Sequence, residues 1–267
     1  MSYIGTIRKM LTEYSTETGD VQYSLTLDNN PVCSMNELVG KEITISYQEN
    51  IYCTACGAKT KKTFSDGLCY RCFITLPQAD MCIMKPHECH FHKGTCRDEE
   101  WGQKHCFQAQ TLYLSRSSCI KIGITRQHQQ FTRWVDQGAI EAMAIGTFPN
   151  RLEVGKAEYA ISAELSDRTN WRNMLKNNVT DAPFEDYLDK AKELLDEEQR
   201  ENLIENVKAY KFNYPVKRYP EKVKSFKLDK VPFYSKELTG IKGQYLIFGD
   251  EVINLRSHSG YEVSISC

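Results

Sequence analysis

The sequence predicts an α+β protein whose two β-rich ends flank a cysteine-rich module and an α/β core. Three observations support this prediction: apolar and polar residues alternate near both termini, cysteines cluster in the first half, and an apolar period of helical spacing follows. We expect four segments in chain order: a β-rich segment at 1–50, the cysteine-rich module at 51–108, the α/β core at 109–206, and a basic aromatic stretch leading into a β-rich unit at 207–267.

The chain has 267 residues and a formal net charge of −1 at neutral pH. This length is sufficient for two compact units, and the small net charge creates no overall field that would attract nucleic acid or a membrane. The N-terminal stretch is mixed and polar, unlike a secretory signal, and no apolar run approaches the roughly 20 residues needed to cross a bilayer. We therefore expect a cytoplasmic protein without a membrane partner.

The two ends of the chain have the pattern of β-strands. Residues 21–27 and 41–49 alternate apolar and polar side chains, with a break of turn-forming residues at 28–31. Residues 243–266 have the same character, with Gly-Asp and Ser-Gly as turns. We expect the two ends to share one barrel-like unit or one sheet.

Eleven cysteines are an unusual number, and eight of them fall within residues 53–106 together with four of the six histidines. In a reducing compartment such clustering favours metal binding over disulfides. Cys53 and Cys56 form one Cys-x2-Cys pair and Cys69 and Cys72 form a second, with twelve residues between the pairs. Such turns place two thiolates at the spacing of a tetrahedral ion, so we predict a zinc ribbon with a structural Zn²⁺. A redox pair or buried thiols are the alternatives.

A second group of ligands follows, with cysteine spacings of six, six and nine residues that match no simple paired turn. The ligands that we predict for a second Zn²⁺ are Cys82, Cys89, Cys96 and Cys106. His90 or His92 in place of Cys89 is the main alternative, although these histidines can also be ordinary surface residues. A catalytic zinc, with three protein ligands and water, would need one of these positions free.

The central region has the pattern of a hairpin followed by helices. Residues 111–115 and 119–125 alternate apolar and polar side chains on either side of a polar turn. From 151 to 207 the apolar residues recur at helical spacing. The stretch 185–205 contains nine acids against three basic residues and is expected to be a solvated helix face.

The order of chemistry-bearing residues across this core resembles the GIY-YIG nuclease superfamily. Tyr113 lies on the first expected strand, Lys-Ile-Gly lies on the second, Arg133 lies on the following segment, and Glu158 lies on a later helix. In that superfamily two short strands carry the motifs of its name and the next helix presents an arginine. A later helix presents a glutamate that binds a divalent metal.

The resemblance implies a catalytic set of Tyr113, Lys121, Arg133 and Glu158, with Mg²⁺ or Mn²⁺ at Glu158. Phosphodiester cleavage needs a base near the attacking water, a cation on the developing phosphorane charge and a divalent ion on the leaving side. The sequence departs from the superfamily in its motifs, because the first lacks its glycine and Lys121 replaces the tyrosine of the second. It also departs in spacing, because only seven residues separate the two motifs and the distance from Gly123 to Arg133 is slightly long. Lys121 either holds a phosphate or marks the loss of cleavage.

Longer strings over almost the whole chain resemble the bacterial family of uncharacterised proteins labelled domain of unknown function 2797. They include CTACGAKT, CHFHKGTCRDEEWGQKHC, LYLSRSSCIKIGITR and GIKGQYLIF. The resemblance implies that RWVDQGA and DRTNWR are signature segments, and it implies no particular activity. The substrate-binding residues that we infer from these segments and the hairpin are Gly123, Arg126, Trp134, Asp136, Gln137, Arg168, Asn170 and Trp171. The tryptophans are equally candidates for packing.

Three functions are compatible with these patterns. The first is an enzyme that acts on nucleic acid, RNA or a single strand rather than duplex DNA, through the predicted catalytic set. Residues 207–236 support it, because eight lysines and Arg218 are interleaved with seven aromatic residues that suit phosphates and unpaired bases. Pairing of these lysines with the acidic stretch is the alternative. The second function is a non-catalytic zinc-stabilised module that binds RNA or DNA. The third is a zinc-dependent enzyme that modifies or hydrolyses nucleic acid at the second cysteine group.

Overall fold

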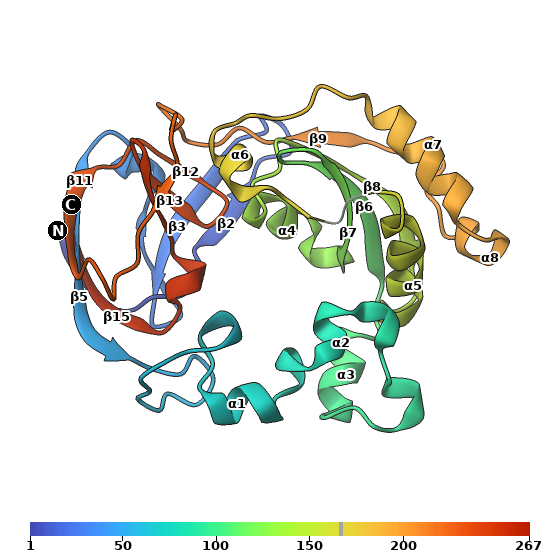
Figure 1. Ribbon diagram of the computed structural model, residues 1–267, viewed down its shortest axis with the longest axis horizontal. Helices are drawn as coiled ribbons and strands as arrows, with labels where there is room; N and C mark the ends of the chain where they lie inside the picture. Colours follow the sequence, from blue (N-terminus) through green and yellow to red (C-terminus); the bar gives the residue numbers. More distant parts are fainter. Residues whose placement is uncertain (166–167) are drawn as a thin grey trace. The chain divides into compact units, whose positions relative to one another are not determined.

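A computed structural model describes residues 1–165 and 168–267 of the chain, which folds into two compact units (Figure 1). Unit 1 comprises Met1–Ile74, Leu175–Asn177 and Phe212–Cys267, and unit 2 comprises Thr75–Met174 and Asn178–Lys211. The cysteine-rich module expected at 51–108 is therefore divided between the two units. Asp167, the first residue of the DRTNWR segment, lies outside the described residues.

The two ends of the chain pair with each other in unit 1. Four strands form this sheet: β1 (Ser2–Thr6), β5 (Glu42–Ile51), β11 (Phe233–Glu237) and β15 (Tyr261–Ser266). Their order is β1-β15-β5-β11, and all neighbours are antiparallel. The expectation that the two ends share a sheet is confirmed. The barrel-like alternative is wrong, because the strands of unit 1 form separate sheets and the described part of the chain contains no closed barrel.

Two smaller sheets complete unit 1. One has β2 (Leu11–Tyr14), β3 (Val21–Leu27) and β4 (Asn30–Ser34) in that order. The other has β10 (Lys224–Ser225), β12 (Gly240–Lys242), β13 (Tyr245–Phe248) and β14 (Glu251–Asn254) in the order β10-β14-β13-β12. Asp28 and Asn29 have φ values of 49° and 68°, so the predicted break is a two-residue hairpin turn after which β4 begins at once.

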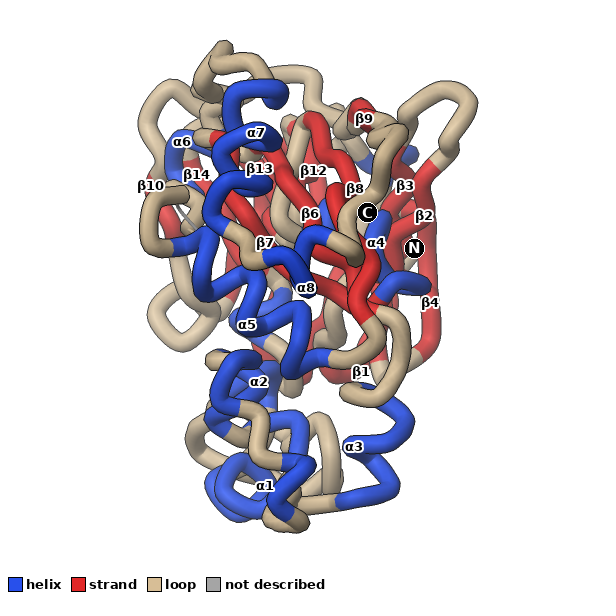
Figure 2. The backbone as a smooth tube through the Cα atoms, turned by 90° about the vertical axis from the view of Figure 1, so that its right-hand side faces the viewer, coloured by secondary structure: helices blue, strands red, loops and turns tan. Residues whose placement is uncertain are grey.

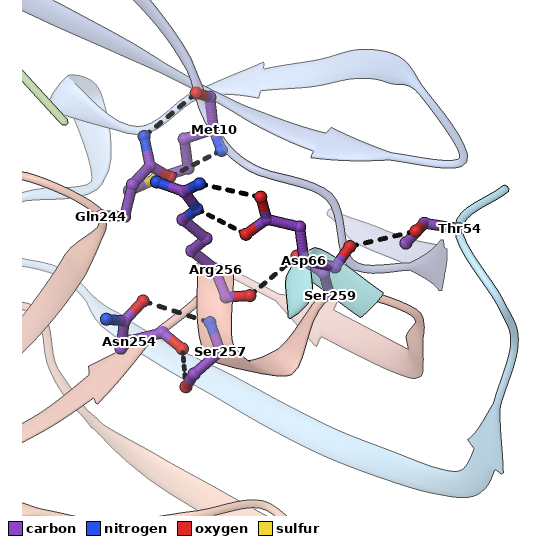
Figure 3. Close-up of polar contacts among 8 residues, drawn as sticks. All are labelled: Met10, Thr54, Asp66, Gln244, Asn254, Arg256, Ser257 and Ser259. Carbon is purple, nitrogen blue, oxygen red and sulfur yellow. Dashed lines mark hydrogen bonds and ion pairs between the residues drawn. The ribbon is translucent and has the colours of Figure 1, made fainter. Parts of the chain in front are cut away.

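The alternation in the sequence explains which side chains unit 1 buries. Val21, Tyr23 and Leu25 of β3 are at most 1% exposed, as the two-residue period of a strand with one covered face requires. A buried amide adds specificity: Gln244 Oε1 accepts the Met10 N–H (2.8 Å), and Gln244 Nε2 donates to the Met10 carbonyl (3.3 Å) (Figure 3). This pair joins the N-terminal chain to the turn between β12 and β13.

The sheet of unit 2 contains the predicted hairpin. Its strands are β6 (Gln110–Arg116), β7 (Ile120–Arg126), β8 (Glu141–Phe148) and β9 (Ala209–Lys211), in the antiparallel order β7-β6-β8-β9. The hairpin expected between 111–115 and 119–125 is β6 and β7. Leu112 and Leu114 point to the apolar core, while Tyr113 between them lies on the opposite face.

Within the described ranges, two helices cover the apolar face of this sheet. The helices that begin in unit 2 are α2 (Met81–Met84), α3 (Glu99–His105), α4 (Gln130–Asp136), α5 (Arg151–Ser162), α6 (Trp171–Leu175), α7 (Phe184–Leu194) and α8 (Glu197–Arg200); α1 (Tyr70–Thr75) begins in unit 1. Helices α5 and α7 lie over β6, β7 and β8 (Figure 2), and Val154, Ala157 and Ile161 of α5 belong to the core. None of the described helices is both long and apolar enough to span a bilayer.

The basic aromatic stretch 207–236 is largely occupied with packing. Tyr210 contacts the ring of Trp134 in unit 2, and Phe212 is 4% exposed in unit 1. Tyr234 stacks on Phe226 with ring centroids 4.2 Å apart. Among the described large hydrophobic residues of this stretch, Phe233 stands out at 64% exposure. Several of these rings therefore contact other side chains of their own unit.

Lys242 is a buried charge in unit 1. Its side chain is 0% exposed, and Nζ donates to Asn177 Oδ1 (2.8 Å) and lies 5.4 Å from the ring centroids of both Tyr214 and Tyr219. Burial lowers the pKa of Lys242 to about 7, because the charged form loses its hydration.

Lys242→Met is expected to make unit 1 more stable at neutral pH. In the unfolded chain the lysine pKa is about 10.4, so folding releases a proton between that pH and about 7. The free energy of unfolding of the wild type therefore rises with pH across this window and is lowest below it. The substitution is expected to add on the order of 4 kcal/mol at pH 7 and almost nothing near pH 10.5. Denaturant unfolding of both proteins at several pH values measures this difference, and a constant difference across the window would contradict it.

Candidate functional site

The four cysteines of the first predicted zinc site converge in unit 1. The Sγ atoms of Cys53, Cys56, Cys69 and Cys72 lie within 4.8 Å of one another, and those of Cys56 and Cys69 are 3.9 Å apart. Four sulfurs bound at about 2.3 Å around a tetrahedral Zn²⁺ have such separations. Gly57 follows the first pair with a φ of 72°, which suits the turn. The cluster could therefore hold a zinc ion and is compatible with a zinc ribbon.

The pKa values of two thiols in this cluster are shifted in opposite directions. Burial raises the pKa of Cys53, but hydrogen bonds from the backbone of Cys56, Cys69 and Ala55 bring it down to about 6. Burial and the three neighbouring cysteines raise the pKa of Cys72 to about 12. Cys53 and Cys72 therefore do not ionise together on their own, and a bound cation is what would hold both as thiolates.

Polar contacts and close packing join the first cluster to the segment before β15 (Figure 3). Asp66, between the two cysteine pairs, forms a two-atom ion pair with Arg256 (2.7 and 2.8 Å), and its carbonyl accepts from Thr54 Oγ1 (3.0 Å). Gly67 has a φ of 91°, and a Cβ there would lie 2.8 Å from the carbonyl oxygen of Ser259. An ion in the cluster would thus connect residues that follow β5 to the C-terminal strand.

The second group of cysteines lines a small cavity in unit 2. The cavity has a volume of about 10 Å³, which is about the space of a single water-sized atom. Burial raises the pKa of Cys82 to about 12 and that of Cys106 to about 11, with a contribution from neighbouring thiols. Gly102 of α3 allows the close approach, since a Cβ there would lie 3.3 Å from Cys96 Sγ. The potential ligands that line the cavity are Asp80, Cys82, Cys89, His90, Cys96 and Cys106.

The structure adds an aspartate to this group and distinguishes the two histidines. Ligand atoms of Asp80, Cys82 and His90 lie within 4.8 Å of one another, whereas His92 is exposed and does not line the cavity. Asp80 also accepts the Cys82 N–H as the N-cap of α2 (3.3 Å) and forms an ion pair with Arg97 (2.7 Å). Of the two histidines considered as substitutes for a cysteine, only His90 is placed to ligate.

Tyr113 is the centre of another polar group in unit 2. Its phenol is fully buried and donates to Gln137 Oε1 (3.0 Å). Burial raises the pKa of Tyr113, the guanidinium of Arg133 against the phenol oxygen lowers it, and the nearby carboxylate of Glu158 raises it. Asp136 precedes Gln137 at the end of α4 and is half-buried. Three of the four predicted catalytic residues, with Gln137, therefore lie together.

The other residues of the hairpin are packed around Tyr113. Gly123 is its partner on β7, and a Cβ at Gly123 would lie 2.6 Å from the Tyr113 hydroxyl, so only glycine leaves room for the ring. Lys121 shares this face of β7, lies opposite Ser115 and is 5% exposed. Trp134 is 0% exposed and packs edge-on against the Tyr113 ring, with centroids 5.8 Å apart. In this structure Trp134 therefore has a packing role.

The remaining predicted substrate-binding residues lie at opposite ends of the hairpin. Arg126 is the last residue of β7. Asn170 lies at the turn between β6 and β7, where its N–H donates to Ser118 Oγ (3.0 Å). Arg168 and Trp171 belong to the same segment as Asn170. The structure therefore separates this segment from Arg126 by the length of the hairpin.

Arg151 was not identified from the sequence. It is the first residue of α5, its N–H donates to the Cys106 carbonyl (2.9 Å), and its Nη2 donates to the Ile83 carbonyl (2.8 Å). Burial lowers the pKa of Arg151, whereas Cys106 and Glu158 raise it. An arginine at a helix start carries no distinctive local pattern, and only its contacts with residues distant in the sequence reveal its position.

Together these features define an α+β protein with several antiparallel sheets and a four-cysteine cluster that could bind zinc. The family model described as "Protein of unknown function (DUF2797)" matches residues 40–263, and the chain belongs to this family. Comparison with curated proteins and with solved structures finds no match.

Proposed function

We propose that this chain is a zinc-stabilised protein that acts on nucleic acid, with RNA or another single strand as its ligand. The observation that carries this proposal is the group formed by Tyr113, Arg133 and Glu158, which brings a phenol, a cation and a carboxylate from three elements together. The same residue types occur in the same chain order in the GIY-YIG nucleases that the core resembles. A guanidinium beside a carboxylate suits a phosphodiester, because it neutralises phosphate charge next to a group that can hold a divalent ion.

Both cysteine clusters have structural roles in this proposal. Cys53, Cys56, Cys69 and Cys72 hold one Zn²⁺, and Cys82, Cys89, Cys96 and Cys106 hold a second. The second cavity has room for one ion and none for a substrate, which favours a structural ion over the zinc-dependent enzyme considered above. Thiolates that ligate metal persist in a reducing compartment such as the cytoplasm.

The burial of Tyr113 favours a positioning role over a chemical one. Its hydroxyl is inaccessible, its proton is donated to Gln137, and its pKa is raised by burial. A phenol in this state does not serve as a base at neutral pH, so Tyr113 positions Gln137 and Arg133. In a cleaving enzyme Glu158 would hold Mg²⁺ or Mn²⁺, which would supply Lewis acidity at the phosphate.

The same observation supports a second candidate function, a module that binds nucleic acid without cleaving it. A buried Tyr113, together with Lys121 in place of the motif tyrosine, leaves Arg133 able to bind phosphate without a side-chain base. The two candidates differ only in whether the divalent ion at Glu158 leads to cleavage.

Glu158→Ala and Arg133→Ala test the proposal. If the chain is a nuclease, Mg²⁺-dependent cleavage of a labelled single-stranded RNA is expected to fall about 100-fold or more in each variant, because each removes charge stabilisation of the transition state. Glu153→Ala on the same helix is the matched control, since Glu153 is on the exposed side and pairs with Lys156 (3.1 Å).

Gel-based cleavage and fluorescence anisotropy, measured together, separate the two candidates. RNA binding without cleavage in the wild type, weakened in Arg133→Ala, would identify the non-catalytic module. A folded, zinc-loaded wild type that neither binds nor cleaves RNA or DNA would exclude both.

A further inference from the structure

Two arginines lie at one end of the sheet in unit 2, where β6 begins and β7 and β8 end; we call this end the sheet edge. Gln110, the first residue of β6, is the ladder partner of both Arg126 on β7 and Phe148 on β8. The chain turns after Phe148, and Arg151 begins α5 three residues later. The topology alone therefore brings the end of β7 and the start of α5 to the two sides of Gln110.

One short segment fixes both arginines at this edge. The Cys106 carbonyl accepts the Arg151 N–H (2.9 Å), and the Ala109 carbonyl accepts the Gln127 N–H (3.0 Å), directly after Arg126. The Arg151 side chain is held by the Ile83 carbonyl at Nη2, while its Nε is buried and has no hydrogen-bond partner among the described residues. A buried donor without an acceptor is unfavourable, and an anion is one acceptor that would satisfy it.

The charges at this edge repel one another. Arg126 and Arg151 lie close enough to each other for their charges to interact, and Arg133 lies close enough to Arg151 to do the same. Glu158 is the carboxylate that faces Arg151. Arg133 also contacts Tyr113, so the arginines extend from the sheet edge to the Tyr113 group.

We propose that Arg126 and Arg151 together bind one phosphate group of the nucleic acid, and that the second cysteine group holds Arg151 in place for this task. The ligand's identity rests on the proposed function; the anion site itself rests on the geometry. Arginine suits this role because its planar guanidinium offers paired donors to phosphate oxygens. A phosphate there would neutralise the mutual repulsion and lie next to Glu158, where a divalent ion would be held.

Arg126→Ala, Arg151→Ala and Arg151→Lys test the proposal in the zinc-loaded 267-residue chain. The probe is a fluorescein-labelled oligouridylate, titrated by fluorescence anisotropy at several salt concentrations, with inorganic pyrophosphate as competitor. Each alanine variant is expected to bind about tenfold more weakly and to lose about one unit of salt slope. Arg151→Lys is expected to keep the slope and lose affinity, because it retains the charge without the paired donors. Lys156→Ala, an equal charge change on the exposed side of α5, is the control and is expected to resemble the wild type.

The results of these titrations distinguish failure of the anion site from failure of the proposed function. Wild-type affinity and slope in both alanine variants would overturn the proposal, as would an Arg151→Ala chain that loses zinc yet binds RNA normally, since Arg151 would then be only a counter-ion of the thiolates. If Arg151→Ala does not fold, Arg126→Ala and Arg151→Lys decide the question. Pyrophosphate binding that depends on the arginines, without RNA binding, would support the anion site and overturn the proposed function. Binding of neither probe would overturn both.

Discussion

Cys69→Ser is expected to abolish zinc binding at the first cluster and to unfold the segment that follows β5. Structural zinc contributes folding free energy directly, with apparent values of about 10–16 kcal/mol at pH 7, comparable with the whole margin of about 5–15 kcal/mol of a domain. The segment between the cysteine pairs is held by the exposed Asp66–Arg256 ion pair and by the packing of Gly67. Exposed ion pairs contribute about 1 kcal/mol or less, so the remaining contacts are not expected to replace the ion.

Thermal unfolding and limited proteolysis measure this effect. The variant is expected to have a midpoint lower by more than 10 °C, given that about 1 kcal/mol shifts the midpoint by several degrees in a domain of this size, and to be cleaved between β5 and α1. Cys267→Ser is the matched control, since that cysteine is exposed at the chain end. An unchanged midpoint and digestion pattern in Cys69→Ser would rule out a structural ion there.

Gly155→Ala is expected to destabilise unit 2, although alanine is the better helix former. A Cβ at Gly155 would lie 2.6 Å from the Pro86 carbonyl carbon and 2.7 Å from the His87 nitrogen, both backbone atoms. Backbone cannot move aside as a flexible side chain can, so overpacking of about 1–3 kcal/mol or more exceeds the helix-propensity gain of about 1 kcal/mol. The substitution would push α5, with Arg151 and Glu158, away from the residues between Cys82 and Cys89.

Denaturant unfolding followed by hydrogen exchange checks this prediction. Faster exchange is expected at the start of α5, with exchange in the strands of unit 1 unchanged. Lys156→Ala serves again as the control, since it alters the same helix without entering the contact. A Gly155→Ala variant as stable as the wild type would mean that α5 and the Pro86 turn do not pack closely.

The parts of the fold that could be predicted are those with local patterns. The strand at 21–27 and the Tyr113–Gly123 hairpin could be predicted because apolar and polar residues alternate within each short stretch. The first cysteine cluster could be predicted because the Cys-x2-Cys spacing is itself that of a metal-binding turn. The break at residues 28–31 was also predicted from its turn-forming residues, although the turn itself consists only of Asp28 and Asn29. The pairing of the two chain ends was expected, but the alternation alone did not distinguish a sheet from a barrel.

The parts that could not be predicted depend on contacts between distant residues. The division of residues 51–108 between two units follows from which surfaces each cysteine group packs against, and no boundary in composition marks it. Asp80 lies in the second cluster because it caps α2 by accepting the Cys82 N–H. Arg151 lies at the sheet edge because its N–H donates to the Cys106 carbonyl. The rings of 207–236 had the composition of a base-stacking surface, yet most pack within their own unit, because aromatic composition does not distinguish burial from exposure.

Two structural zinc ions are the central proposal for how this fold is stabilised, and the metal content of the purified chain tests it. Inductively coupled plasma mass spectrometry on the wild type, Cys69→Ser and Cys89→Ser is expected to find two zinc ions per chain in the wild type. It is expected to find one in each variant, because the two clusters lie in different units. A wild-type chain without zinc, whose cysteines all react rapidly with a thiol reagent while the fold persists, would contradict the account.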